Sequence, residues 1–114
     1  MPYFKIKTNI NLDALKTETF LKKASAFSST ILEKPETYIM AEVDAHVPMI
    51  FNKSSEPAAY VELKSIGLKK DNAKTLSKKI CAFLEAELEI SPDRVYIDFC
   101  NIDGSMFGWN KTTF

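Results

Sequence analysis

Hydrophobic and polar side chains alternate along residues 3–8 (YFKIKT), and this period of two is typical of a strand with one buried face. Apolar side chains then recur at helical spacing, which predicts a helix over residues 14–32, and either Asn11 or Asp13 can cap its first turn. A second strand is predicted over residues 38–43. The first half of the chain is therefore predicted to be strand, helix, strand.

The second half of the chain carries the same succession of patterns. Residues 60–66 (YVELKSI) are predicted to form a strand, and a mostly apolar stripe indicates a helix from about residue 71 to residue 89. Residues 95–101 form the next predicted strand, and the tail 102–114, which holds two glycines, is predicted to form a small hairpin. Between the halves, residues 44–59 are rich in Pro, Asn and Ser and are predicted to be mainly loop.

The two halves also resemble each other in their residues. FKIKT in the first half aligns with VELKS in the second at an offset of 57 residues, and KPE aligns with SPD at the same offset of 57. Each match is weak alone, but two matches at one offset indicate a duplicated unit. We therefore predict one domain over residues 1–114, built from a pseudo-repeat of residues 2–57 and 58–114.

A strand–helix–strand unit joins two parallel strands through a right-handed crossover. Two such units predict an α+β fold in which a four-stranded mixed sheet carries both helices on one face. The other face of the sheet has no predicted cover, and it presents Tyr60, Ile66 and Tyr96 among charged side chains. We expect a face of this kind to be shared between subunits of an oligomer.

Composition and charge argue against several classes of function. Fifteen basic residues balance fifteen acidic ones, so we expect no nucleic-acid partner. No segment approaches the roughly 20 apolar residues that span a bilayer, and the first residues lack a signal-peptide pattern, so we expect no membrane insertion and a cytoplasmic protein. Cys81 and Cys100 are expected to be reduced thiols. A single histidine, His46, and only three glycines predict no metal site and no cofactor.

The chain begins with Met1-Pro2 and continues directly into the first predicted strand. An initiator methionine is usually removed when the next residue is small, and its removal here would leave Pro2 with a free secondary amine. Model α-amino groups have pKa values of about 7.7–8.0, closer to neutrality than any lysine, so this amine is a candidate base. The alternative is that Pro2 is only the first residue of a strand, where proline is tolerated.

Five stretches of the sequence are distinctive: MPYFKIKTN, EKPETYIM, SSEPAAYVELKSIG, ISPDRVYIDF and FGWNKTTF. Taken together and in this order, they strongly resemble the macrophage migration inhibitory factor (MIF) family of the tautomerase superfamily. The resemblance covers essentially the whole chain. It implies the duplicated fold described above and assembly as a homotrimer.

The resemblance also implies an isomerase activity. The family reaction is keto–enol tautomerisation of phenylpyruvate-type substrates and dopachrome-like compounds, with the N-terminal proline as catalytic base. The implied partners are further copies of the chain and a small aromatic 2-keto acid. Animal members also act as secreted cytokines through a cell-surface receptor and leave the cell without a signal peptide, so secretion and a receptor are further implications.

The resemblance assigns a role to each position that matches the family's site. Pro2 is implied as the general base, and Lys34 as the cation that meets the substrate carboxylate or carbonyl oxygen and keeps Pro2 neutral. Ile66, next to Ser65, is implied to offer a backbone amide to the carboxylate, and Tyr96 is implied to come from a neighbouring subunit. The other implied substrate-binding residues are Tyr38, Asp98, Phe107, Trp109 and Phe114.

The residues alone also permit a simpler interpretation of these positions. Lys34 sits where a helix C-terminus favours a cation, and the aromatic residues are of types that usually serve packing. The sequence further departs from the family pattern: Asp98 replaces an asparagine, Phe107 a frequent valine and Lys64 a frequent histidine, and the CxxC of the vertebrate factor is absent. Asp98 would repel a carboxylate and would oppose the effect of Lys34 on Pro2. These departures support the alternative of a cytokine-like, receptor-binding homologue with weak or vestigial tautomerase activity.

Overall fold

Strand β1 (Tyr3–Thr8) lies inside the sheet, where its alternating pattern buries one set of side chains. The computed structural model describes residues 1–114. Phe4, Ile6 and Thr8 are fully buried, and the three side chains that alternate with them are half-buried on the other face. The strand predicted over residues 3–8 is confirmed.

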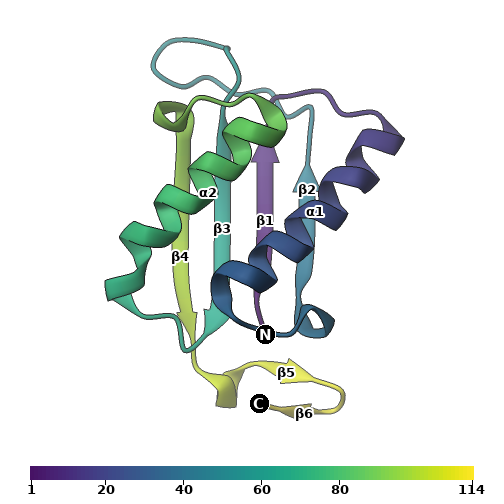
Figure 1. Ribbon diagram of the computed structural model, residues 1–114, viewed down its shortest axis with the longest axis vertical. Helices are drawn as coiled ribbons and strands as arrows, with labels where there is room; N and C mark the ends of the chain where they lie inside the picture. The colour runs from purple at the N-terminus through teal and green to yellow at the C-terminus, as the bar shows by residue number, and fades with distance from the viewer.

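Four strands form one sheet in the order β2-β1-β3-β4 (Figure 1). The other three are β2 (Met40–Asp44), β3 (Ala59–Ile66) and β4 (Val95–Ile102). β1 pairs in parallel with β2, β3 pairs in parallel with β4, and the antiparallel contact of β1 with β3 joins the two pairs. The predicted α+β fold with a four-stranded mixed sheet is confirmed.

Helix α1 (Ala14–Leu32) begins at a capped N-terminus. The Asp13 carboxylate accepts a hydrogen bond from the backbone N–H of Lys16 at 2.8 Å, which satisfies one of the free donors of the first turn. Of the two candidates, Asp13 and not Asn11 is therefore the cap. Helices α1 and α2 cover the same face of the sheet, as predicted (Figure 1).

Helix α2 (Ala73–Leu88) follows a single 3-10 turn, Lys70–Asn72, so the helix predicted from about residue 71 starts slightly later as an α-helix. Both long helices end at a glutamate in the left-handed region, Glu33 at φ 53° and Glu89 at φ 55°. A left-handed residue turns the chain sharply away from the helix axis. Neither helix has the length and apolar character needed to cross a membrane.

The core lies between the two helices and the sheet. Phe27 of α1 stacks on Phe83 of α2 with ring centroids 4.2 Å apart, and the Phe4 ring of β1 lies 6.1 Å from Phe27. Ile80 and Leu84 of α2 are fully buried against the same cluster. Both halves of the chain thus contribute to one hydrophobic core.

The C-terminal hairpin lies at the end of the sheet where β1 begins, close to the N-terminus (Figure 1). Strands β5 (Gly108–Trp109) and β6 (Thr112–Thr113) are joined by Asn110 and Lys111, which both have positive φ, as a tight hairpin turn requires. The predicted hairpin in the tail is confirmed. The Phe114 N–H donates to the carbonyls of Gly104 at 3.1 Å and Phe107 at 3.3 Å, which ties the tail back onto itself.

The strand predicted over residues 38–43 begins only at Met40. Residues Glu36–Tyr38 form a 3-10 turn instead, in which the Tyr38 N–H donates to the Pro35 carbonyl at 3.1 Å. The proline fixes the backbone angle that starts this turn. The turn directs Tyr38 away from the ladder of the sheet and toward the C-terminal hairpin.

The long loop between β2 and β3 is held by Arg94, which lies just before β4. The Arg94 guanidinium donates hydrogen bonds of 2.8–3.1 Å to four backbone carbonyls of the loop, those of Phe51, Ser54, Glu56 and Pro57. Its cation also lies 5.4 Å from the centre of the Phe51 ring. A planar group with five donors suits this role, because one side chain reaches four carbonyls, of which those of Phe51 and Ser54 also accept each other's backbone N–H.

We predict that Leu84→Ala lowers the free energy of unfolding by about 2–5 kcal/mol, because it leaves a cavity in a fully buried part of the core. Urea unfolding at a fixed protein concentration measures the change. Leu15→Ala is the matched control, since Leu15 is 74% exposed and its loss should change the stability little. Equal effects of the two substitutions would contradict the core described here.

Arg94→Lys is expected to loosen the loop of residues 51–57, because an ammonium keeps the charge but cannot satisfy four carbonyls in one plane. Limited proteolysis should cut within this loop roughly tenfold faster than in the unmodified chain, since hydrogen bonds to a charged group are lost. Lys53→Met, in the same loop, is the control that should leave the cutting rate unchanged. An unaltered rate in Arg94→Lys would show that the guanidinium does not order the loop.

Candidate active site

A cavity of about 530 Å³ opens at the end of the sheet where β1 starts, β3 ends and the C-terminal hairpin folds over. Its volume lies within the range of about 300–1,000 Å³ that small-molecule sites occupy. Most of its lining is apolar. Five residues proposed from the sequence as site residues line it together: Pro2, Tyr38, Phe107, Trp109 and Phe114.

Pro2 is held at the inner wall of this cavity by the sheet. Its side chain is fully buried, and its carbonyl accepts a hydrogen bond from the Met40 N–H at 3.1 Å, which extends the pairing of β1 with β2 by one residue. The position of the Pro2 nitrogen is therefore set by backbone pairing and not by a flexible tail.

Aromatic rings form one side of the cavity. The Tyr38 ring meets the Trp109 ring edge-on at 5.4 Å, and the Phe114 ring stacks on Trp109 at 5.7 Å. Phe107 stacks on Phe114 at 6.0 Å. Because Tyr38, Trp109 and Phe114 remain partly exposed, they offer an apolar surface on which a flat ring can lie.

Lys34 acts on the amine at the start of the chain. The left-handed residue Glu33 ends helix α1, and the next backbone N–H, that of Lys34, donates to the Ser29 carbonyl at 3.2 Å, which fixes where Lys34 leaves the helix. Burial lowers the pKa of the Met1 α-amine below its ordinary value of 8.0, and the positive charge of Lys34 lowers this pKa further. Both effects favour a neutral amine at this position.

Lys64 also lines the cavity, although the sequence did not single it out as a site residue. It lies on β3 directly opposite Tyr3 of β1, so the antiparallel register brings it next to the start of the chain. Its ammonium has no carboxylate within 4 Å and no hydrogen-bond partner in the chain. The available signal was the alternation of β3, which puts Lys64 on the same sheet face as Ile66.

Ser65 and Ile66 do not line the cavity within one chain. The Ser65 side chain is buried on the helix-covered face of the sheet, and its hydroxyl lies 3.4 Å from the Ile66 carbonyl. Ile66 is half-buried at the end of β3, opposite Ile102 of β4. Any contact of a ligand with this pair would therefore be made by the backbone or the Ile66 side chain, and not by the Ser65 hydroxyl.

Tyr96 and Asp98 lie away from the cavity of their own chain. Tyr96 stands opposite Tyr60, four residues before Lys64 on β3, which is about 13 Å along the strand. It packs on Phe51 with ring centroids 4.8 Å apart, and Asp98 accepts a hydrogen bond of 3.5 Å from the Tyr60 hydroxyl. The proximity of Asp98 raises the pKa of Tyr60. Both side chains are exposed on the uncovered face of the sheet, where a second subunit can meet them.

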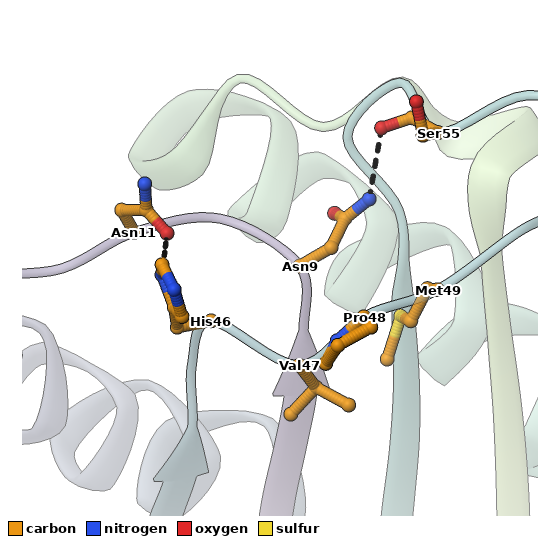
Figure 2. A pocket seen from close by; sticks show the side chains of 7 residues that line it. All are labelled: Asn9, Asn11, His46, Val47, Pro48, Met49 and Ser55. Carbon is orange, nitrogen blue, oxygen red and sulfur yellow. Dashed lines mark hydrogen bonds between the residues drawn. The ribbon is translucent and has the colours of Figure 1, made fainter.

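A second cavity, of about 340 Å³, lies at the opposite end of β1 (Figure 2). Its polar side chains form hydrogen bonds within the loop around it. The Asn9 amide nitrogen donates to the Ser55 carbonyl at 3.1 Å, the Asn9 oxygen accepts from the Ala58 N–H at 2.9 Å, and Asn11 is hydrogen-bonded to His46. Since these side chains are already used to hold the loop, this cavity is the weaker candidate for a ligand site.

Across residues 1–114, no three side chains of the metal-binding types gather into one site. Cys81 and Cys100 are both free thiols. Burial and the nearby Glu85 raise the pKa of the Cys81 thiol, which keeps it in the less reactive protonated form.

Comparison with known proteins identifies close relatives over the whole length. The family described as macrophage migration inhibitory factor (MIF) matches residues 1–114. A macrophage migration inhibitory factor homolog from Brugia malayi is 39% identical over 117 residues, which cover 100% of this chain and 99% of the relative. Crystal structures of homologues from Prochlorococcus marinus and Trichinella spiralis superpose with TM-scores of 0.90 and 0.89, both at 34% identity, and cover 98% of this chain.

The matching regions cover 98% and 99% of those two solved chains, so the similarity includes the C-terminal hairpin and both helices. The elements that surround the cavity at the start of β1 are therefore part of the shared fold.

We predict that Lys34→Gln raises the pKa of the N-terminal amine toward 8.0, because it removes a positive charge that disfavours the ammonium form. Burial persists in this variant, so the pKa should not return fully to the ordinary value. The pH dependence of amine acylation, followed by mass spectrometry, measures the pKa. Lys22→Gln is the control on the same helix, because Lys22 pairs with Glu18 on an exposed face. A pKa that does not respond to Lys34→Gln would contradict this electrostatic coupling.

Proposed function

This chain belongs to the macrophage migration inhibitory factor family, and from that premise we propose that it is a keto–enol tautomerase whose general base is Pro2. The proposed substrates are aromatic 2-keto acids of the phenylpyruvate type, together with dopachrome-like compounds. The observation that carries the proposal is the buried N-terminal proline at the wall of an aromatic-lined cavity, next to a cation that favours a neutral amine.

The proposed reaction needs one base and a surface that holds the substrate. The neutral Pro2 nitrogen removes a proton from the carbon beside the keto group, and the electron pair of that C–H bond forms the new carbon–carbon double bond. The keto oxygen takes the electron pair of the former C=O π bond and then a proton. Keto and enol forms are isomers, so the reaction uses no oxidant, reductant or cofactor.

The electrostatics of the site support Pro2 as the base. General bases work best when their pKa lies near the working pH. The α-amine at this end of the chain already has a lowered pKa through burial and through Lys34. We propose that the same two effects act on the Pro2 amine, because Pro2 is more deeply buried than Met1.

Removal of Met1 is a requirement of this proposal. While Met1 is attached, the Pro2 nitrogen belongs to a tertiary amide and has no basic lone pair. The intact mass of the protein from its natural source distinguishes the two forms by the mass of one methionine.

We also propose that the active form is a homotrimer. Tyr96 and Asp98 reach no site in their own chain, yet they lie exposed on the uncovered face of the sheet beside Tyr60. A neighbouring subunit packed on this face would bring both side chains to a cavity. Assembly of this kind would also cover the exposed tyrosines. An exposed surface with large aromatic side chains commonly marks a contact between subunits.

The second candidate function is binding of a cell-surface receptor with weak or vestigial catalysis. The curated relatives are named for inhibition of macrophage migration. The half-buried Phe107 at the cavity and the exposed Asp98 on the sheet face support this candidate. A phenylalanine in place of the family's frequent valine would narrow the mouth, and a carboxylate brought to a cavity by a neighbouring subunit would repel an anionic substrate. This second candidate requires that the protein is secreted, so that it can reach the receptor.

We predict that Pro2→Gly lowers the rate of phenylpyruvate enolisation by roughly 10²–10⁴-fold, the range that a positioned general base contributes. Absorbance of the enol measures the rate, with circular dichroism as the check on folding. Pro48→Gly is the matched control, because Pro48 lines the other cavity.

Both variants are compared with a parent protein whose intact mass shows that Met1 is absent. Equal, negligible rates in the parent and in Pro2→Gly would reject the tautomerase and leave receptor binding as the surviving candidate.

A further inference from the structure

Lys64 is the charged side chain whose surroundings the proposed mechanism does not explain. Three lysines of the chain have carboxylate partners: Lys5 with Glu42 at 3.6 Å, Lys22 with Glu18 at 3.3 Å and Lys23 with Glu87 at 3.1 Å. Lys64 has none, although it is half-buried and lines an apolar cavity. A cation in such a place, with no anion of its own chain, is suited to an anion that arrives with a ligand.

Two carboxylates lie nearby on the same face of the sheet, and neither pairs with Lys64. Glu62 is two residues before Lys64 on β3, and Asp98 stands opposite Glu62 on β4. Both carboxylates therefore lie two residue positions along the strands from Lys64. Asp98 is instead hydrogen-bonded to the Tyr60 hydroxyl. The Lys64 side chain lines the cavity rather than lying over these acids.

The register of the sheet puts Lys64 at the end of the cavity where Pro2 lies. Its Cα is paired with that of Tyr3, the residue after Pro2, whereas the aromatic rings of Tyr38, Trp109 and Phe114 form a separate wall. In an aromatic 2-keto acid, the carboxylate lies two bonds from the carbon that loses its proton, and the ring lies on the other side of that carbon. With the ring on the aromatic wall and the reacting carbon at Pro2, the carboxylate falls on the side of Lys64.

We propose that Lys64 is a substrate-positioning residue that binds the carboxylate of the 2-keto acid and so selects acids over uncharged aromatic aldehydes and ketones. The inference rests on the proposed function of the same cavity and adds a division of roles between two lysines. Lys34 is the cation that lowers the pKa of the terminal amine, and Lys64 is the lysine that lines the cavity itself. We assign a contact with the substrate carboxylate to Lys64, while Lys34 keeps its effect on the base.

Trp109 supplies a test that does not depend on catalysis. It is the single tryptophan of the chain and it lines the cavity, so quenching of its fluorescence reports a ligand. The probes are trans-cinnamate, which has an aromatic ring and a carboxylate, and cinnamamide, its neutral counterpart.

We expect the unmodified trimeric protein to bind cinnamate at least roughly tenfold more tightly than cinnamamide, as a charge-assisted contact predicts. Lys64→Met should remove this preference, Lys64→Arg should restore it, and Lys7→Met, on the same sheet face but outside the cavity, should leave it unchanged.

Steady-state kinetics supply the second readout. Lys64→Met should raise KM for phenylpyruvate roughly tenfold and leave the acid limb of the pH profile of kcat/KM in place, whereas Lys34→Gln should shift that limb to higher pH. A cinnamate preference that survives in Lys64→Met, or that is absent from the unmodified protein, would overturn the proposal. A protein with no Pro2-dependent activity but with a Lys64-dependent preference would reject the tautomerase and retain the anion site.

Discussion

The pairing of β1 on both of its edges is the constraint on which the rest of the structure depends. β1 is hydrogen-bonded to β2 on one side and to β3 on the other, so the first residues of the chain are fixed at the middle of the sheet. A chain terminus is usually mobile, and an amine on a mobile terminus is solvated and charged. Here the same hydrogen bonds that build the sheet hold Pro2 in an apolar wall, so the fold itself favours a neutral amine at the start of the chain.

Two lysines near the start of the chain differ in their surroundings from the lysines on the exposed helix faces. The ion pairs of Lys22 and Lys23 lie on largely exposed helix surfaces, where they contribute little to stability. Lys34 and Lys64 are half-buried near the N-terminal amine and have no carboxylate partner in the chain. The chain has no net charge, yet two positive side chains lie close to the start of β1. These two charges are what an anionic substrate would meet.

Local patterns in the sequence were sufficient for the elements but not for the site. The alternation of Phe4, Ile6 and Thr8 predicted β1, and the helical stripe that includes Ile80 and Leu84 predicted α2, because both patterns depend on residues close in the chain. Lys64 was not identified as a cavity residue, since its place beside Pro2 depends on the register between strands 60 residues apart in the chain. The MIF resemblance pointed to the aromatic residues that gather at the cavity, but only the observed tail geometry explains how Phe114 reaches Trp109.

The hydrogen bonds between Arg94 and the loop that joins β2 to β3 bear on the order in which the molecule folds. These hydrogen bonds join residues 37 to 43 positions apart. Closing a segment of that length costs chain entropy before any of these hydrogen bonds can form. We therefore expect the contact between Arg94 and this loop to form after β3 and β4 have paired, and to be the first part of the native state to open. It lies at the far end of the sheet from Pro2. Thermal fluctuation of the loop is therefore separated from Pro2 by the full length of the central strands.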